Sequence, residues 1–100
     1  EIQQKLYEEV MTALENSKSL TIPTVAELKS MPYLDMINKE SMRIMTTVTA
    51  LQREAMEDCV LSNGLMVPKG TQVHLQLWAI HHDPKIFNNP DVFDPERFRE

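Results

Sequence analysis

The stretch Pro32-Tyr-Leu-Asp-Met-Ile-Asn-Lys-Glu-Ser-Met-Arg43 decides how the rest of the chain is organised. Its apolar pattern predicts a helix that begins near Pro32, since proline is tolerated in a first turn. Glu40 and Arg43, three positions apart, would lie on one face of that helix. An arbitrary pair of this kind is usually exposed, but the apolar residues on both sides favour burial. A buried carboxylate needs further donors, and the second guanidinium that could supply them is that of Arg97.

The rest of the amino-terminal half is also predicted to be helical. Residues 1–15 form an amphipathic pattern in which Glu1 and Lys5 are spaced for an ion pair on the wet side. Residues 16–19 are expected to end this helix, and residues 21–23 to be extended before a proline. Thr24 and Glu27 match a capping box, which opens a short helix through Lys29. The packing positions are Ile2, Leu6, Val10, Met11 and Leu14 in the first helix, and Tyr33, Leu34, Ile37, Ser41, Ile44 and Met45 in the third.

The carboxyl-terminal half is predicted to contain strands and loops. The β-branched run Thr46–Thr49 favours leaving the helix for extended structure, and residues 53–58 resemble a polar strand edge. A hairpin is predicted over Cys59–Val67, with its turn at Asn63-Gly64. A turn at residues 68–70 and an alternating strand over Thr71–Leu75 follow, with Thr71, Val73 and Leu75 on one face. The remainder is a short apolar helix over 77–80 and a proline-rich loop anchored by Phe87, Phe93 and Phe98.

Composition excludes several functional classes. One hundred residues suffice for one small domain with a core. The net charge of −5 and the absence of a basic stripe argue against a nucleic-acid partner. No apolar run approaches the ~20 residues of a membrane span. Two glycines cannot build a phosphate-binding glycine-rich loop, and a single cysteine cannot form an internal disulfide.

The chain has few candidate chemical groups apart from the arginine–glutamate set. A zinc site would have to use Cys59, His74, His81 and His82, but their spacing lacks the usual paired-ligand units. Cys59 is better explained as a small strand residue. The ends of the chain resemble those of a piece cut from something longer. From the residues alone, the prediction is an α+β piece without an assigned function.

The order of the motifs resembles that of the cytochrome P450 superfamily, the haem-thiolate monooxygenases. Six motifs follow one another in the family's order over essentially all 100 residues, and this order makes the resemblance specific. They are Gln-Lys-Leu-x-x-Glu at Gln4–Glu9, Met31-Pro-Tyr-Leu34, Glu40-Ser-Met-Arg43, Val67-Pro-Lys-Gly-Thr71, His81-His-Asp-Pro84 and Phe93-Asp-Pro-Glu-Arg-Phe98.

The resemblance implies a mainly α parent fold with small sheets, in which the first helix is helix J and residues 32–45 are helix K. It implies that Glu40, Arg43 and Arg97 are the family's structural Glu-Arg-Arg triad. Arg53 would contact a haem propionate, because a guanidinium suits a carboxylate. The segment that lines the substrate pocket would contain Thr47, Val48, Thr49 and Leu51. Relatives usually carry one or two prolines shortly after the helix K arginine, where this chain has Thr46 and Thr47.

Residues 1–100 are therefore expected to be a partial cytochrome P450 domain, inactive alone. The family's Phe-x-x-Gly-x-Arg-x-Cys-x-Gly loop is absent from them, so the iron ligand would lie beyond Glu100 and Cys59 is not it. The oxygen-activating helix before helix J is absent too. The parent would insert one atom of O₂ into an apolar substrate, with NADPH electrons delivered by a reductase. It would be anchored at the eukaryotic endoplasmic reticulum by a segment not contained in these residues. The alternative is a non-catalytic α+β interaction module with Glu40 and Arg43 as a surface pair.

Overall fold

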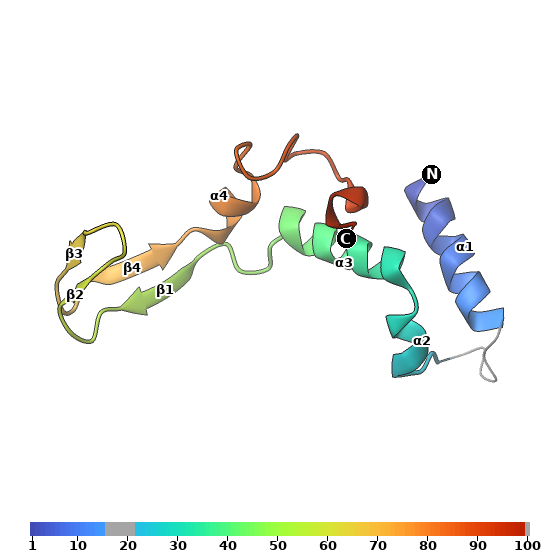
Figure 1. The fold of residues 1–100 in the computed structure, drawn as a ribbon, viewed down its shortest axis with the longest axis horizontal. Coiled ribbons are helices and arrows are strands. Elements are labelled where there is room, and N and C mark those ends of the chain that lie inside the picture. Colours follow the sequence, from blue (N-terminus) through green and yellow to red (C-terminus); the bar gives the residue numbers. More distant parts are fainter. Residues whose placement is uncertain (16–21, 100) are drawn as a thin grey trace. The chain divides into compact units, whose positions relative to one another are not determined.

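The computed structural model of the chain describes residues 1–15 and 22–99 (Figure 1). The chain divides into two compact units, one of residues 1–42 with 93–100 and one of residues 43–92. The first holds the amino-terminal helices, and the second holds both two-stranded sheets. The predicted α+β class is confirmed, with helices followed by a hairpin and a further strand. The expected break at residues 16–19 and the start of the expected extended stretch at residue 21 lie outside the described residues.

Helix α1 spans Ile2–Glu15, as its apolar stripe predicts. Leu6, Val10 and Leu14 are half-buried, whereas Met11 is 40% exposed. The expected Glu1–Lys5 ion pair is wrong, because the Lys5 ammonium pairs with the Glu96 carboxylate instead. The same ammonium lies 4.4 Å from the centroid of the Tyr33 ring. A longer-range pair has therefore replaced a local one within the first unit.

Two helices follow, and both begin where the sequence predicts. Helix α2 is Val25–Lys29, and its capping box is complete: Glu27 N donates to Thr24 Oγ1, and Thr24 N donates to the Glu27 carboxylate. Helix α3 is Pro32–Ile44. Tyr33 on its packing face is 5% exposed, but Met45 lies beyond the helix and is 79% exposed, so its place on that face is wrong. The helix stops before the β-branched run, which lowers helix propensity.

The carboxyl-terminal part of the first unit is more regular than the predicted loop. Residues Pro95–Phe98 form a 3₁₀ helix, η1, with Asp94 as its amino-terminal cap. Asp94 Oδ1 accepts from Glu96 N at 3.1 Å, and the fixed φ of Pro95 suits the first position of a helical turn. Phe98 is half-buried, but Phe93 is 37% exposed and does not anchor the segment as expected.

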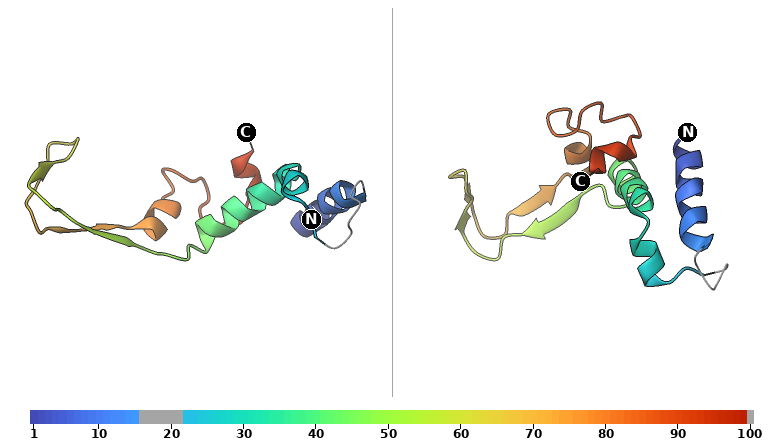
Figure 2. Two further views of the ribbon diagram at one scale, coloured as in Figure 1. Left: turned by 90° about the horizontal axis from the view of Figure 1, so that it is seen from below. Right: turned by 45° about the vertical axis from the view of Figure 1, so that its right-hand side comes forward.

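The second unit is built on two antiparallel strand pairs, visible in two orientations in Figure 2. Strand β1 (Leu51–Glu54) pairs with β4 (Gln72–Leu75), with Leu51 opposite Leu75. The expected strand edge over residues 53–58 is wrong beyond Glu54, because Ala55 leaves the strand and joins the turn before β4. The alternating strand is present as β4, and Val73 and Leu75 on its apolar face are 38% and 46% exposed.

The predicted hairpin is present as β2 (Cys59–Val60) paired with β3 (Met66–Val67). Its turn uses Asn63, whose Oδ1 accepts from Leu65 N, and Gly64 at φ +84°. Gly64 N donates to Leu61 O at 2.8 Å, so the loop is longer than the two-residue turn that Asn-Gly often makes. The turn at residues 68–70 is present too, with Gly70 at φ +81°.

Helix α4 (Leu77–His81) follows β4 and ends one residue later than predicted. Among the described residues the fully buried apolar side chains are few, namely Met31, Tyr33, Val67 and Pro95. Many large apolar side chains are exposed instead, including Met56, Val60, Leu65 and Met66 around the hairpin. In residues 1–15 and 22–99 no helix has the length and apolarity that crossing a membrane requires.

Candidate functional site: a buried carboxylate on α3

The centre of the first unit is the carboxylate of Glu40, which is 0% exposed. Helix α3 places it against the segment that leads into η1. Glu40 Oε1 accepts from Asp94 N at 2.9 Å and from Arg97 Nε at 3.1 Å. The structure thus brings Arg97 to Glu40, as the need for a second guanidinium suggests. The Arg97 side chain is itself only 13% exposed.

The hydrogen bonds of the Glu40 carboxylate stabilise the fold. A charge taken out of water is stable only when charged partners and hydrogen bonds compensate it. The Arg97 guanidinium and the Asp94 amide provide compensation of both kinds for Glu40. Pro95 is fully buried beside them, so η1 is anchored by polar and apolar contacts together. The Glu40 carboxylate therefore fixes the carboxyl-terminal segment of the unit onto α3.

Arg43, near the end of α3, belongs to the second unit and is 2% exposed. Its Nη1 donates to His81 O at 2.8 Å and its Nη2 to Val92 O at 3.4 Å. Its guanidinium also lies 5.2 Å from the centroid of the Phe87 ring. These two backbone carbonyls accept from the Arg43 guanidinium, which ties α4 and the loop after it to the last turn of α3.

The residues expected to face a cofactor or substrate lie in the second unit. Thr47, Val48 and Thr49 form an exposed segment after α3, and Leu51 begins β1 half-buried. Arg53 is exposed on β1, and its Nη1 donates to Gln52 O at 2.8 Å. Cys59 is an exposed free thiol on β2. No group of three potential metal-binding side chains was found within residues 1–15 and 22–99.

Two charged contacts were not foreseen in the sequence. The carboxylate of Glu9 accepts from Tyr33 N and Leu34 N, each at 2.9 Å, and so satisfies two free amides at the start of α3. The carboxylate of Glu96 is held by Lys5 and by Arg99, whose Nε donates at 2.6 Å. The hydrogen bonds from Lys5, and then from Arg99, lower the pKa of Glu96 below its usual value of 4.5.

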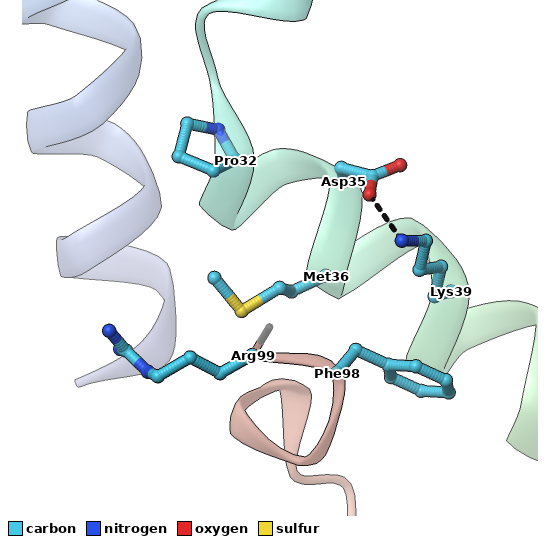
Figure 3. Close-up of a pocket in the computed structure, with 6 residues that line it drawn as sticks. All are labelled: Pro32, Asp35, Met36, Lys39, Phe98 and Arg99. Carbon is cyan, nitrogen blue, oxygen red and sulfur yellow. Dashed lines mark ion pairs between the residues drawn. The ribbon is translucent and has the colours of Figure 1, made fainter.

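A surface pocket of about 300 Å³ opens between α3 and the end of η1 (Figure 3). Its polar residues are already paired: Lys39 Nζ lies 2.8 Å from Asp35 Oδ2, and Arg99 pairs with Glu96. Met36 and Phe98 supply apolar wall. The pocket lacks a convergent set of unsatisfied polar groups, which a ligand site would normally present.

The family model described as Cytochrome P450 matches residues 1–100. The chain belongs to the cytochrome P450 family. It is 40% identical over 100 residues to cytochrome P450 6j1 of Blattella germanica, covering 100% of this chain and 20% of that protein. It is 41% identical over 98 residues to cytochrome P450 3A11 of Mus musculus, covering 98% of this chain and 19% of that protein. The chain thus spans about a fifth of the length of these curated relatives.

The fold agrees with a solved cytochrome P450. A zebrafish cytochrome P450, in a structure with abiraterone, matches with a TM-score of 0.87 and 37% identity. The match covers 99% of this chain and 24% of the zebrafish chain. The resemblance drawn from the motif order is therefore confirmed, as is the cytochrome P450 fold with α1 and α3 as helices J and K. The roles of Arg53 and of the pocket residues stay predictions.

Proposed function

We propose that residues 1–100 are a partial cytochrome P450 domain of a haem-thiolate monooxygenase. The whole protein would insert one atom of O₂ into an apolar organic substrate, with NADPH electrons delivered by a reductase. We infer that these residues alone do not catalyse. The observation that carries the proposal is the buried Glu40 carboxylate, bonded to Arg97 and Asp94 in a chain that the family model matches throughout.

Among the residues present, Arg53 is suited to bind a haem propionate. Arg53 is exposed, and its guanidinium makes no ion pair with any described residue, so it is available to a propionate carboxylate. The iron ligand is proposed to lie outside these residues, because Cys59 falls on a short exposed strand and not in the family's cysteine loop. When bound, a thiolate-ligated haem would supply the oxygen chemistry, since the thiolate favours O–O cleavage.

We propose that these residues stabilise the fold, hold the cofactor and form part of the substrate pocket. Glu40, Arg43 and Arg97 would form the structural triad, and Arg53 would orient the cofactor through one propionate. Thr47, Val48, Thr49 and Leu51 would form part of the wall of the substrate pocket. The relatives named above are insect and mouse proteins, which supports a eukaryotic parent, and we propose the endoplasmic reticulum membrane as its location.

The alternative, a non-catalytic interaction module, is less well supported. It requires Glu40 and Arg43 to be an exposed pair, whereas they are 0% and 2% exposed. It also offers no reason for Arg97 to bind Glu40.

The deciding experiment is the reduced, CO-bound difference spectrum of the full-length polypeptide expressed with haem. A Soret band at the long wavelength typical of thiolate ligation is expected. Absence of the band from a folded product would reject the monooxygenase proposal. Arg53→Gln should lower haem retention while Arg99→Gln, a matched exposed guanidinium, should not. Equal retention in both variants would reject the propionate role of Arg53.

A further inference from the structure

The segment between α3 and β1 is attached to α4 at two points, both inside the second unit. At its start, Thr46 Oγ1 lies 2.8 Å from His81 Nδ1. At its end, Trp78 N donates to Thr49 O at 3.1 Å. Only Thr47 and Val48 stand between the two attachments, and both are exposed. Helix α4 therefore holds a short bridge of backbone whose middle two side chains point away from any packed core.

The hydrogen bonds at Thr46 also favour one tautomer of the His81 ring. The Thr46 hydroxyl is within 3.1 Å of Arg43 O, which can only accept. A hydroxyl carries a single proton, so donation to Arg43 O leaves its oxygen to accept from the imidazole. Neutral His81 is then the tautomer that carries its proton on Nδ1. One threonine side chain thus joins the last turn of α3 to the ring of His81.

His81 is a firm attachment point because its other groups are engaged as well. Its backbone oxygen accepts from the buried Arg43 guanidinium at 2.8 Å. Its ring meets the Phe87 ring edge to face, with centroids 6.4 Å apart. The Trp78 ring at the other attachment stacks on His82, with centroids 4.3 Å apart. Both ends of the bridge are consequently attached to residues that make further contacts of their own.

We propose that Thr46 and His81 are positioning residues that set the path of residues 47–49. A proline can restrict such a bridge through its ring. In this chain a side-chain hydrogen bond does so, and the bridge keeps its amide hydrogens. The clamp stands on the contacts above, whereas its effect on substrate rests on the proposed function, which assigns Thr47, Val48 and Thr49 to the pocket wall.

The first test is amide hydrogen exchange, followed by mass spectrometry, on the full-length protein. Thr46→Val keeps the shape but removes the hydroxyl, and should speed exchange of the Trp78 amide, which is bonded to Thr49 O, about five- to tenfold. Thr46→Ser should restore protection. Thr71→Val is the matched control, because Thr71 is also half-buried and its hydroxyl makes no hydrogen bond to a described residue. The Leu61 amide, bonded to Leu65 O, serves as an internal reference that should not change.

A second pair of variants tests the imidazole. His81→Phe should reproduce the fast exchange of Thr46→Val, whereas His81→Asn, whose amide can donate from nearly the same place, should recover part of the protection. Wild-type exchange in Thr46→Val, or failure of Thr46→Ser to restore it, would overturn the clamp. None of these readouts needs haem or turnover, so they are independent of the proposed function.

The link to the pocket is tested by binding of 1-dodecylimidazole, with imidazole as the head-group control, to the haem-loaded full-length protein. Thr46→Val should change the ratio of the two dissociation constants about fivefold, and Thr46→Ser should not. An unchanged ratio in a variant with fast exchange would overturn the link to the pocket while leaving the clamp. Absence of the thiolate-type band would overturn the proposed function instead.

Discussion

Glu40 and Arg97 are 57 residues apart in the chain, yet Arg97 Nε donates to Glu40 Oε1 at 3.1 Å in a buried position. Removal of Arg97 takes away the guanidinium that is bonded to the buried Glu40 carboxylate. We expect Arg97→Ala in the full-length protein to lower the free energy of unfolding by about 3–5 kcal/mol. Arg97→Lys should recover little, because an ammonium cannot reproduce the guanidinium geometry. Denaturant unfolding measures both.

The control for that prediction is Arg99→Ala. Arg99 carries the same charge two residues away, but its side chain is 60% exposed, and it should cost about 1 kcal/mol or less. Equal losses of unfolding free energy in Arg97→Ala and Arg99→Ala would contradict a stabilising role for the buried bond between Arg97 and Glu40.

Glu9 provides a second prediction, because its carboxylate accepts from the Tyr33 and Leu34 amides at the start of α3. Glu9→Gln replaces one acceptor oxygen by a donor and removes a negative charge from a helix amino terminus. A loss of about 1 kcal/mol in unfolding free energy is expected. Glu8→Gln is the neighbouring control: Glu8 is exposed and bonds to Gln4 within α1, so its loss should be about 0.5 kcal/mol or less.

The Glu96 carboxylate predicts a pH dependence. Lys5 and then Arg99 lower its pKa in the folded protein below the usual 4.5, so the folded state favours the ionised form. The ionised carboxylate therefore contributes its full stabilisation above pH 4.5. That stabilisation is lost as the pH falls through the lowered pKa of the folded state. The urea midpoint of Glu96→Gln should lie below that of the wild type at pH 7, and the two should converge in acid. A gap that persists at low pH would contradict this origin.

The hairpin turn allows a test of backbone conformation alone. Gly64 has a φ of +84°, and a Cβ built there meets no heavy atom within 4 Å. Gly64→Ala should thus cost about 1 kcal/mol through the left-handed backbone rather than through a clash. Gly70→Ala, at φ +81° with the same open surroundings, should cost the same. Melting temperatures of both variants check this, and a neutral Gly64→Ala would contradict it.

Local features of the fold could be predicted from the sequence, because their causes lie within a few residues. Thr24 and Glu27 cap α2, and Pro32 begins α3, as expected. The strand pairing of β1 with β4 was missed, because its partners are some twenty residues apart and no turn signal joins them directly. The exposure of Val73 and Leu75 could not be predicted either, since alternation indicates which side chains share a face and not what covers that face.

The candidate site shows the same division. Arg97 could be predicted as the partner of Glu40, because a buried carboxylate requires a second donor and few arginines are available. Glu9 could not, because an acidic residue on an amphipathic helix is ordinarily solvated. Helical spacing predicts that Lys5 pairs with Glu1. Lys5 instead pairs with Glu96, a carboxylate distant in sequence that also binds Arg99.

The distance in sequence between Glu40 and Arg97 has a consequence for synthesis. At common translation rates the ribosome needs roughly 3–11 s to add the 57 residues that separate them. Throughout that interval Glu40 has no guanidinium from Arg97, so burial of its face of α3 is unfavourable. We therefore expect the amino-terminal helices to stay hydrated and loosely associated until Arg97 has been synthesised. Emergence of η1 from the ribosome would be the event that allows it to pack on α3. Glu40 would thus determine when this unit folds during translation.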